Sequence, residues 1–219
     1  MYWNDDNETD AVTPSHDKID FVFQLIGQTL PQNYLGGFAD VLHNQTSFWG
    51  ENECVSFFVH IAGEEGNGWY RDSHPDAVIH LSRRNMLVIR APIHLSLMVI
   101  NMAGMNLDIS QHNVQLKHKH NKEIRSSPTL YSRYVVCDDQ SESDFIESVT
   151  AQLAALKVRC KKLLCGKTRR FIVNGKQLVT CSLMLEGLSK EDSIVIQSSG
   201  IGGHQKTGCG VFIPHKSAI

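Results

Sequence analysis

The 219-residue sequence lacks several features that would place it in a common class of protein. No apolar run reaches the roughly 18 residues that a membrane span needs, so we expect no membrane partner. The first ten residues are acidic and polar rather than basic and then apolar, which argues against a secretory leader. The six cysteines include no CxxC pair, a pattern that predicts a reduced, cytoplasmic protein without a disulfide framework.

The sequence also lacks the signatures of several enzyme classes. It contains no serine-hydrolase elbow, no HExxH motif and no paired-carboxylate motif. His118 and His120 form an HxH pair, but no third ligand follows at a known spacing, so we expect no metal and no cofactor. Cys54 and Cys209 could act as nucleophiles only beside a positioned base, which a sequence does not reveal.

The formal net charge of −2 is an average over two unlike halves. Residues 1–110 carry 5 Lys and Arg against 14 Asp and Glu, whereas residues 111–219 carry 16 against 9, so the two net charges are −9 and +7. Residues 157–170 hold seven basic side chains and no acidic one. A run of one sign attracts phosphates regardless of sequence, although a solvated surface remains the alternative.

Apolar periodicity predicts a similar series of strands and helices in each half. In the first half we predict a helix over residues 31–42 and a hairpin formed by residues 77–81 and 86–89. In the second half we predict a hairpin around Asn174-Gly175 and a helix that begins after Ser189. Two further predicted helices cover residues 93–103 and 144–157, and the other predicted strands cover residues 19–27, 54–61, 130–137 and 211–213. Residues 107–116 are predicted to contain another short strand or a hairpin.

This element order, strand, helix, strands, helix, strand, occurs twice and is typical of the ferredoxin-like fold. We therefore predict an α+β protein of two tandem ferredoxin-like (RRM-like) domains. The predicted organisation is an acidic flexible tail over residues 1–17, an N-terminal domain over residues 18–125 and a C-terminal domain over residues 126–219.

A glycine-rich loop over residues 200–210 has five glycines in eleven residues, which allows backbone N–H groups to approach an anion closely. Gln205 stands where a P-loop has the glycine before its lysine, and also where a dinucleotide fingerprint has its third glycine. A nucleotide-dependent enzyme is therefore a weak alternative. A mobile connector between a helix and a strand is the other interpretation.

Two C-terminal segments, Leu185-Glu-Gly-Leu-Ser-Lys-Glu-Asp-Ser193 and Gly200-Ile-Gly-Gly-His-Gln-Lys-Thr-Gly-Cys-Gly-Val-Phe-Ile-Pro214, make the sequence recognisable. They resemble the CRISPR-associated endoribonucleases that cut precursor CRISPR RNA within its repeats, in particular the Myxan-type subgroup. Ile19-Asp-Phe-Val-Phe-Gln-Leu-Ile-Gly27 is similar to the first strand of that subgroup, and Arg133-Tyr-Val-Val136 matches the start of its second domain more loosely. The resemblance covers residues 18–214.

The resemblance implies binding of a CRISPR repeat RNA, often as a stem-loop, and metal-independent cleavage by the neighbouring 2′-hydroxyl. The ends would be a 2′,3′-cyclic phosphate and a 5′-hydroxyl, and the protein would stay with its product among other effector-complex subunits. A non-catalytic guide-RNA-binding subunit of the same fold is the main alternative.

The resemblance also implies candidate site residues. His43 best matches the catalytic histidine of the family's first helix, with Tyr34 as a helper and His60 and His204 in reserve. The residues expected to bind RNA are Lys161, Lys162, Lys167, Arg169 and Arg170, together with Gly200, Gly202, Gly203, His204, Lys206, Gly208 and Gly210 of the loop.

Overall fold

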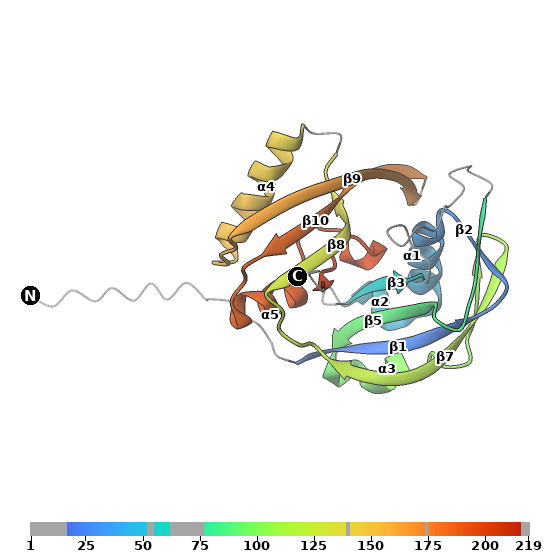
Figure 1. Ribbon diagram of the computed structural model, residues 1–219. Helices are drawn as coiled ribbons and strands as arrows, with labels where there is room; N and C mark the ends of the chain where they lie inside the picture. The colour runs from blue at the N-terminus through green and yellow to red at the C-terminus, as the bar shows by residue number, and fades with distance from the viewer. Residues whose placement is uncertain (1–16, 52–54, 62–76, 139–140, 174, 216–219) are drawn as a thin grey trace, which may run out of the picture.

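The computed structural model describes residues 17–51, 55–61, 77–138, 141–173 and 175–215. The predicted acidic tail therefore lies outside the described residues, apart from Asp17. Two antiparallel sheets, one from each half of the chain, lie above one another in Figure 1. The predicted α+β fold of two tandem ferredoxin-like units is confirmed.

The N-terminal unit contains a five-stranded sheet with the order β3-β5-β1-β7-β6. Without β6, this is the strand order that a βαββαβ ferredoxin-like chain produces. The helices are α1 (Tyr34–Gln45), α2 (Ser47–Glu51) and α3 (Ser96–Ile100), and the 3-10 turn η1 (Ile93–Leu95) leads into α3. The strands are β1 (Lys18–Ile26), β3 (Ser56–His60), β5 (Met86–Pro92), β6 (Asn106–Ile109) and β7 (His112–Glu123), and β2 (Thr29–Pro31) pairs separately with β4 (Val78–His80).

The C-terminal unit contains a four-stranded sheet with the order β11-β8-β10-β9. Ser141 and Ser189 cap its two helices, because each hydroxyl accepts a hydrogen bond from the backbone N–H three residues later. Its elements are β8 (Thr129–Val136), α4 (Glu142–Ala155), β9 (Lys162–Val173), β10 (Lys176–Glu186), α5 (Lys190–Ser199), the 3-10 turn η2 (Gln205–Thr207) and β11 (Ile213–Pro214). Among the described residues, no helix is both long and apolar enough to cross a membrane.

Helix α1 lies between the two units because small residues at its start permit close packing. A methyl group on Gly36 would overlap the carbonyl oxygen of Ile172 in β9, and one on Gly37 would lie 2.7 Å from Ile109 Cγ2 in β6. The Asn33 side-chain amide also donates a hydrogen bond to the carbonyl of Ile172 at 3.0 Å. The glycine pair therefore lets one helix backbone contact both units.

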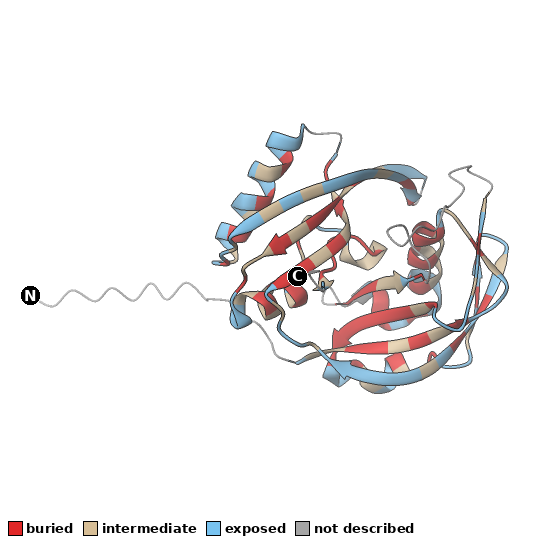
Figure 2. Ribbon diagram, viewed as in Figure 1, coloured by how far each residue is buried: buried red, intermediate tan, exposed pale blue. Residues whose placement is uncertain are grey.

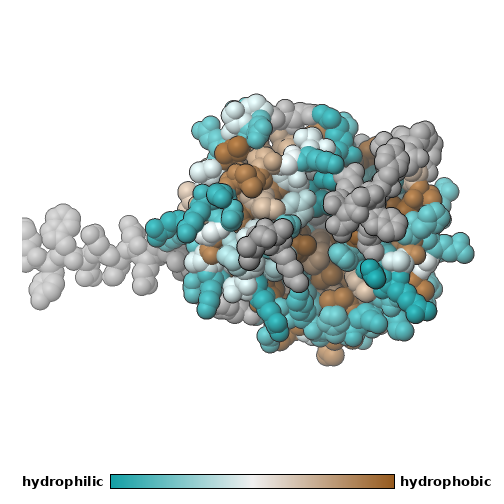
Figure 3. Space-filling model, viewed as in Figure 1, coloured by the Kyte–Doolittle hydropathy of each residue, from teal (hydrophilic) through white to brown (hydrophobic). Residues whose placement is uncertain are grey.

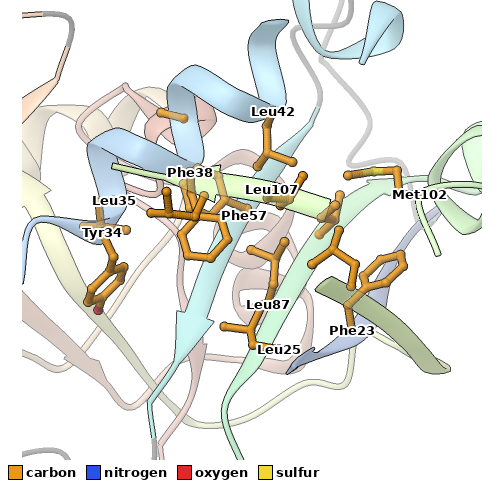
Figure 4. Packing of buried hydrophobic residues seen from close by; sticks show 14 of the residues in the cluster. Phe23, Leu25, Tyr34, Leu35, Phe38, Leu42, Phe57, Leu87, Met102 and Leu107 are labelled. Carbon is orange, nitrogen blue, oxygen red and sulfur yellow. The ribbon is translucent and has the colours of Figure 1, made fainter. Parts of the chain in front are cut away.

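Two hydrophobic clusters form the core. The larger one fills the N-terminal unit between its sheet and helices, with Phe38, Leu42, Phe57 and Leu87 completely buried at its centre (Figure 4). The smaller one lies between the C-terminal sheet and helices α4 and α5. Figure 2 shows that β9, at the edge of the C-terminal sheet, is mostly exposed or half-buried, whereas β5 of the N-terminal sheet is buried along nearly its whole length.

Two of the predicted elements differ from the structure. Residues 77–81 and 86–89 do not form a hairpin, because β4 pairs with β2 whereas β5 pairs with β1 and β3. No strand was predicted for the basic residues 157–170, but from Lys162 onward they belong to the edge strand β9, paired along its length with β10. The hairpin predicted around Asn174-Gly175 is confirmed by the β9–β10 pairing, although residue 174 lies outside the described residues.

Candidate active site and nucleic-acid interface

The glycine-rich loop connects α5 to β11 and folds tightly on itself. All five of its glycines have positive φ angles, between 63° and 83°. A methyl group on Gly210 would overlap the carbonyl oxygen of Ile201, and one on Gly202 would lie 2.7 Å from Val135 Cγ1. Around Gly203, by contrast, nothing lies within 4 Å of the same position. Packing therefore explains most of these glycines, and the exposed part of the loop is Gly203 and His204.

Both ends of the glycine-rich loop are held by the N-terminal unit. Arg90 Nη1 donates hydrogen bonds to the carbonyl of Gln197, just before the loop, at 2.8 Å and to that of Phe212, just after it, at 2.9 Å. The same guanidinium makes a two-pronged ion pair with Asp20, at 2.7 and 3.0 Å. Lys18 Nζ donates to the carbonyl of Ser198 at 2.6 Å. Arg90 is 1% exposed, so these bonds lie in the interior where they are strongest.

The middle of the loop reaches the far end of α1. Lys206 Nζ donates a hydrogen bond to the carbonyl of Gly50 in α2 at 3.3 Å. His43, in the last turn of α1, lies on the same glycine, because a methyl group on Gly50 would be 3.6 Å from His43 Cε1. His43 is exposed and Lys206 is half-buried. The structure thus brings two of the predicted site residues, one from each unit, to the same place.

Gly208 explains how Lys206 can lie so close to the N-terminal unit. A methyl group there would be 2.8 Å from Leu35 Cδ2 and 3.1 Å from Phe57 Cζ, so only a glycine allows the loop to pack flat on α1 and β3. Gly208 and Gly210 are both buried by the protein's own atoms. In this conformation they support the loop, and their predicted contact with RNA stays a prediction.

Tyr34, the other predicted catalytic residue, lies elsewhere. It is 4% exposed, and its hydroxyl is 3.2 Å from the hydroxyl of Tyr134 in β8. Figure 4 shows this hydroxyl pointing away from the hydrophobic cluster. The guanidinium carbons of Arg133 and Arg169 each lie 5.9 Å from the centre of the Tyr134 ring, within the range of a cation–π contact.

Tyr34 and His43 are nine residues apart in one helix, which separates them by about 13 Å along its axis. The structure therefore does not bring the two residues together at one phosphate. The role of Tyr34 as a catalytic helper stays a prediction, and its observed contact is with Tyr134 at the junction of the units.

The two reserve histidines are both exposed. His60 ends β3, three residues and about 10 Å along the strand from Phe57, against which the loop packs. His204 is in the loop itself, two residues before Lys206, in a left-handed conformation with φ of 59°. Of the two, His204 belongs to the same segment as Lys206.

The basic residues from 162 to 170 lie along strand β9, and Lys161 directly precedes it. Lys161, Lys162, Lys167 and Arg170 are exposed, while Arg169 is half-buried beside Tyr134. Lys162 lies 3.4 Å from Glu186, but both side chains are largely exposed, so this ion pair contributes little. Strand β9 therefore presents a row of cations at the free edge of the C-terminal sheet.

The structure bears on one of the two cysteines, Cys54 and Cys209, that were considered as nucleophiles. Burial raises the pKa of the Cys209 thiol to about 12, so it carries almost no thiolate at neutral pH and is not a nucleophile. Cys54 lies outside the described residues. His118 of the HxH pair contacts Asn121 Oδ1 at 2.9 Å and the ring of Phe23. No group of three metal-binding side chains occurs in the part of the chain that the structure describes.

Sequence reasoning missed Arg90 and Tyr134. The signal for Arg90 was present, since it is a single charge in the apolar strand Met86–Pro92, and a buried strand keeps a charge only if that charge is paired. For Tyr134, the pattern indicated only a place in a strand, because its partners come from α1 and β9.

The fold and the candidate site together define a protein of two tandem ferredoxin-like units with a glycine-rich loop at their junction. The model of one family, described as Cas6 Crispr, matches residues 19–217, so the chain belongs to the Cas6 family, as the resemblance in its sequence predicted.

Individual relatives agree with this assignment. The chain is 29% identical over 143 residues to the CRISPR-associated endonuclease Cas6 of Myxococcus xanthus, an alignment that spans 65% of this chain and 61% of the relative. Its fold is similar to that of a Cas6-related protein from Pyrococcus furiosus, with a TM-score of 0.60, 14% identity and coverage of 91% of this chain and 99% of the other. A second solved structure, of a CRISPR-associated protein Cas6, has a TM-score of 0.55 and 11% identity, and the match covers 91% of this chain and 99% of the other.

Proposed function

We propose that this protein binds CRISPR repeat RNA and cleaves precursor CRISPR RNA at a phosphate held between His43 and Lys206. The observation that carries the proposal is that these two side chains, from different units, meet at Gly50. Membership of the Cas6 family and the name of the Myxococcus xanthus relative, an endonuclease, support the same reaction.

The proposed chemistry needs no metal ion. The 2′-oxygen attacks the adjacent phosphorus in line as His43 accepts the 2′-hydroxyl proton, because an imidazole titrates near the working pH. The bond from phosphorus to the 5′-oxygen breaks, which leaves a 2′,3′-cyclic phosphate and a 5′-hydroxyl. Lys206 offsets the charge that builds on the phosphate. His204 is our candidate for the group that protonates the leaving oxygen.

The RNA stem would lie along β9 and the residue before it, where Lys161, Lys162, Lys167 and Arg170 are exposed. A duplex is recognised mostly through its shape and phosphates, which suits a row of exposed cations. We further propose that the protein remains bound to its product as part of a complex with other effector subunits.

The test uses repeat RNA, purified protein and EDTA. Wild-type protein should cleave the RNA under these conditions, and the fragments should carry a cyclic phosphate, whereas RNA with a 2′-deoxy nucleotide at the cleavage position should stay intact. The single-turnover rate of His43→Ala should fall by a factor of about 100 to 10,000, with RNA binding unchanged. His94→Ala, which changes an exposed histidine of the same unit that is not a site candidate, is the matched control.

Two outcomes would contradict the proposal in different ways. RNA that is bound but intact in every reaction would favour the non-catalytic guide-RNA-binding alternative. An unchanged cleavage rate in His43→Ala would exclude His43 as the base, and His204→Ala would be measured next.

A further inference from the structure

Among the described residues, one face of the C-terminal sheet has a helix, α1, only at one end. Helices α4 and α5 pack on the other face, where Leu130, Leu183 and Leu185 are completely buried. Since neighbouring residues of a strand point to opposite faces, Tyr131 and Met184 point to the open one. At the far end of this face Tyr134 and Phe171 pack against the N-terminal unit, so only the end near Tyr131 is exposed.

Four apolar side chains cross the exposed end of this face as one row. The strand register pairs Leu164 with Met184, Met184 with Tyr131, and Tyr131 with Ile213. Directly paired residues share a face, so the row runs across all four strands, over about 14 Å. Leu164 is 52% exposed, and the other three are half-buried. We call Leu164, Met184, Tyr131 and Ile213 the open-face row.

The aromatic member of the row lies on a central strand. Tyr131 belongs to β8, which has β11 on one side and β10 on the other. The His215 ring lies 5.7 Å from the Tyr131 ring, in a tilted contact at an angle of 56°. Figure 3 shows hydrophobic side chains at the surface over β9 and β10. The row therefore offers a flat aromatic ring with apolar flanks.

The charges around the row indicate what would occupy it. From residue 157 to residue 185 the chain has eight basic side chains and no acidic one. Lys162 lies two residues before Leu164 on β9, where it is 3.4 Å from Glu186 of β10, and Arg133 lies two residues after Tyr131 on β8. An apolar and aromatic surface with cationic neighbours complements an unpaired nucleotide, which has an apolar base face and an anionic phosphate. A base-paired stem could not use the ring, because its bases are already stacked.

We propose that the open-face row is a stacking site for one or two unpaired nucleotides that flank the stem of the repeat RNA, with a base lying on Tyr131. This inference rests on the proposed function as far as the repeat RNA is concerned. It adds a second contact, on the sheet face, to the phosphate contacts of β9 and of the loop.

The experiment compares Tyr131→Leu, which keeps apolar bulk but removes the aromatic ring, with Tyr131→Phe, which keeps the ring. Three RNAs are titrated: the whole repeat, the same stem without its unpaired flanks, and a short unstructured oligoribonucleotide. Tyr131→Leu should weaken binding of the whole repeat and of the unstructured RNA by a factor of about 5 to 150, the range of one base–aromatic stack. It should bind the bare stem as the wild type does.

Tyr131→Phe should bind all three RNAs within about twofold of wild type, since base stacking needs the ring and not the hydroxyl. Leu97→Ala, which removes a side chain that is 78% exposed on the N-terminal unit, is the control for loss of surface apolar area. Thermal unfolding of each variant separates a folding defect from a binding defect.

Each remaining outcome decides a separate point. A wild-type protein that does not bind the whole repeat would refute the proposed function, and the unstructured RNA would still test the row. If Tyr131→Leu weakened binding of the whole repeat and of the bare stem equally, the open-face row would be refuted as a site for unpaired nucleotides. Unchanged binding by Tyr131→Leu and by Leu164→Ser would refute it as well and would leave the face to a protein partner.

Discussion

The two units share a strand order but complete their hydrophobic cores in different ways. Every residue of the C-terminal cluster, from Leu130 to Phe212, comes from the C-terminal unit itself. The N-terminal cluster, by contrast, includes Phe171, Val173 and Cys209, which belong to the other unit. The C-terminal unit is therefore closed on itself, whereas the N-terminal unit needs part of its neighbour to fill its interior.

This asymmetry has a consequence for the candidate site. The N-terminal half of the chain supplies His43 and most of the negative charge, and the C-terminal half supplies Lys206 and the cations of β9. The proposed reaction needs His43 and Lys206 at one place, so it depends on how the units dock. The residues that fix the docking are then as important for cleavage as those that would touch the RNA.

The largest loss of stability should come from removing the hydrogen bonds and the ion pair by which Arg90 ties the two units together. Arg90→Met leaves the buried carboxylate of Asp20 without its partner and removes the donor to the carbonyls of Gln197 and Phe212. Loss of one member of a buried ion pair costs about 3–5 kcal/mol, so the free energy of unfolding in urea should fall by that amount.

The control for Arg90 is the double variant Asp20→Asn with Arg90→Met. It has no lone buried charge, so it should be more stable than Arg90→Met alone. If both variants lose the same amount, the cost comes from the loop carbonyls instead. A loss below about 1 kcal/mol in Arg90→Met would mean that the tie does not hold the units together.

The next largest effect should come from substitutions that separate the N-terminal cluster, which includes residues of both units, from the C-terminal cluster, which does not. Phe171→Ala removes a C-terminal side chain, 9% exposed, from the N-terminal cluster, and Phe145→Ala removes one, 3% exposed, from the C-terminal cluster. Each should cost about 3 kcal/mol. Hydrogen exchange should show lower protection in β1, β5 and α1 for Phe171→Ala, but mainly in β8, β10 and α4 for Phe145→Ala.

If Phe171→Ala and Phe145→Ala gave the same hydrogen-exchange pattern, the two clusters would not differ in the way proposed. Uniform loss of protection in both would mean that the protein unfolds as one cooperative unit, whatever the origin of the residues in each cluster.

The sequence predicted the local features of the fold well. Ser189 was identified as a helix cap, and its hydroxyl accepts the hydrogen bond from Asp192 N–H at 3.0 Å. The turn between Ser82 and Asn85 also forms, with the Asn85 side chain accepting from Ser82 N–H at 2.7 Å. The hairpin predicted across that turn was wrong, because a turn signal shows that the chain reverses but not which strand it then pairs with.

The candidate site was predictable in its components but not in its assembly. Glycine spacing marked the loop, and the family resemblance marked His43. Neither could show that Lys206 reaches Gly50 from 156 residues away, or that Gly208 packs on Leu35 and Phe57. Such contacts arise from docking of the two units, and periodicity within one strand or helix carries no information about it.

The smallest expected effect concerns the charge asymmetry. Replacing Lys161, Lys162, Lys167 and Arg170 by glutamine removes one exposed cation just before β9 and three within it, each of which we expect to contribute about 0.2–1 kcal/mol to RNA binding. Counterion release predicts that the slope of log affinity against log salt becomes shallower by up to about 3.6 on a duplex. The matched control replaces Lys117, Lys119 and Lys122, exposed cations of β7 in the N-terminal unit, and should change the slope by less than about 0.5. Equal changes in both variants would show that the RNA contacts the two units alike, and an unchanged slope in both would return the β9 cations to an ordinary solvated surface.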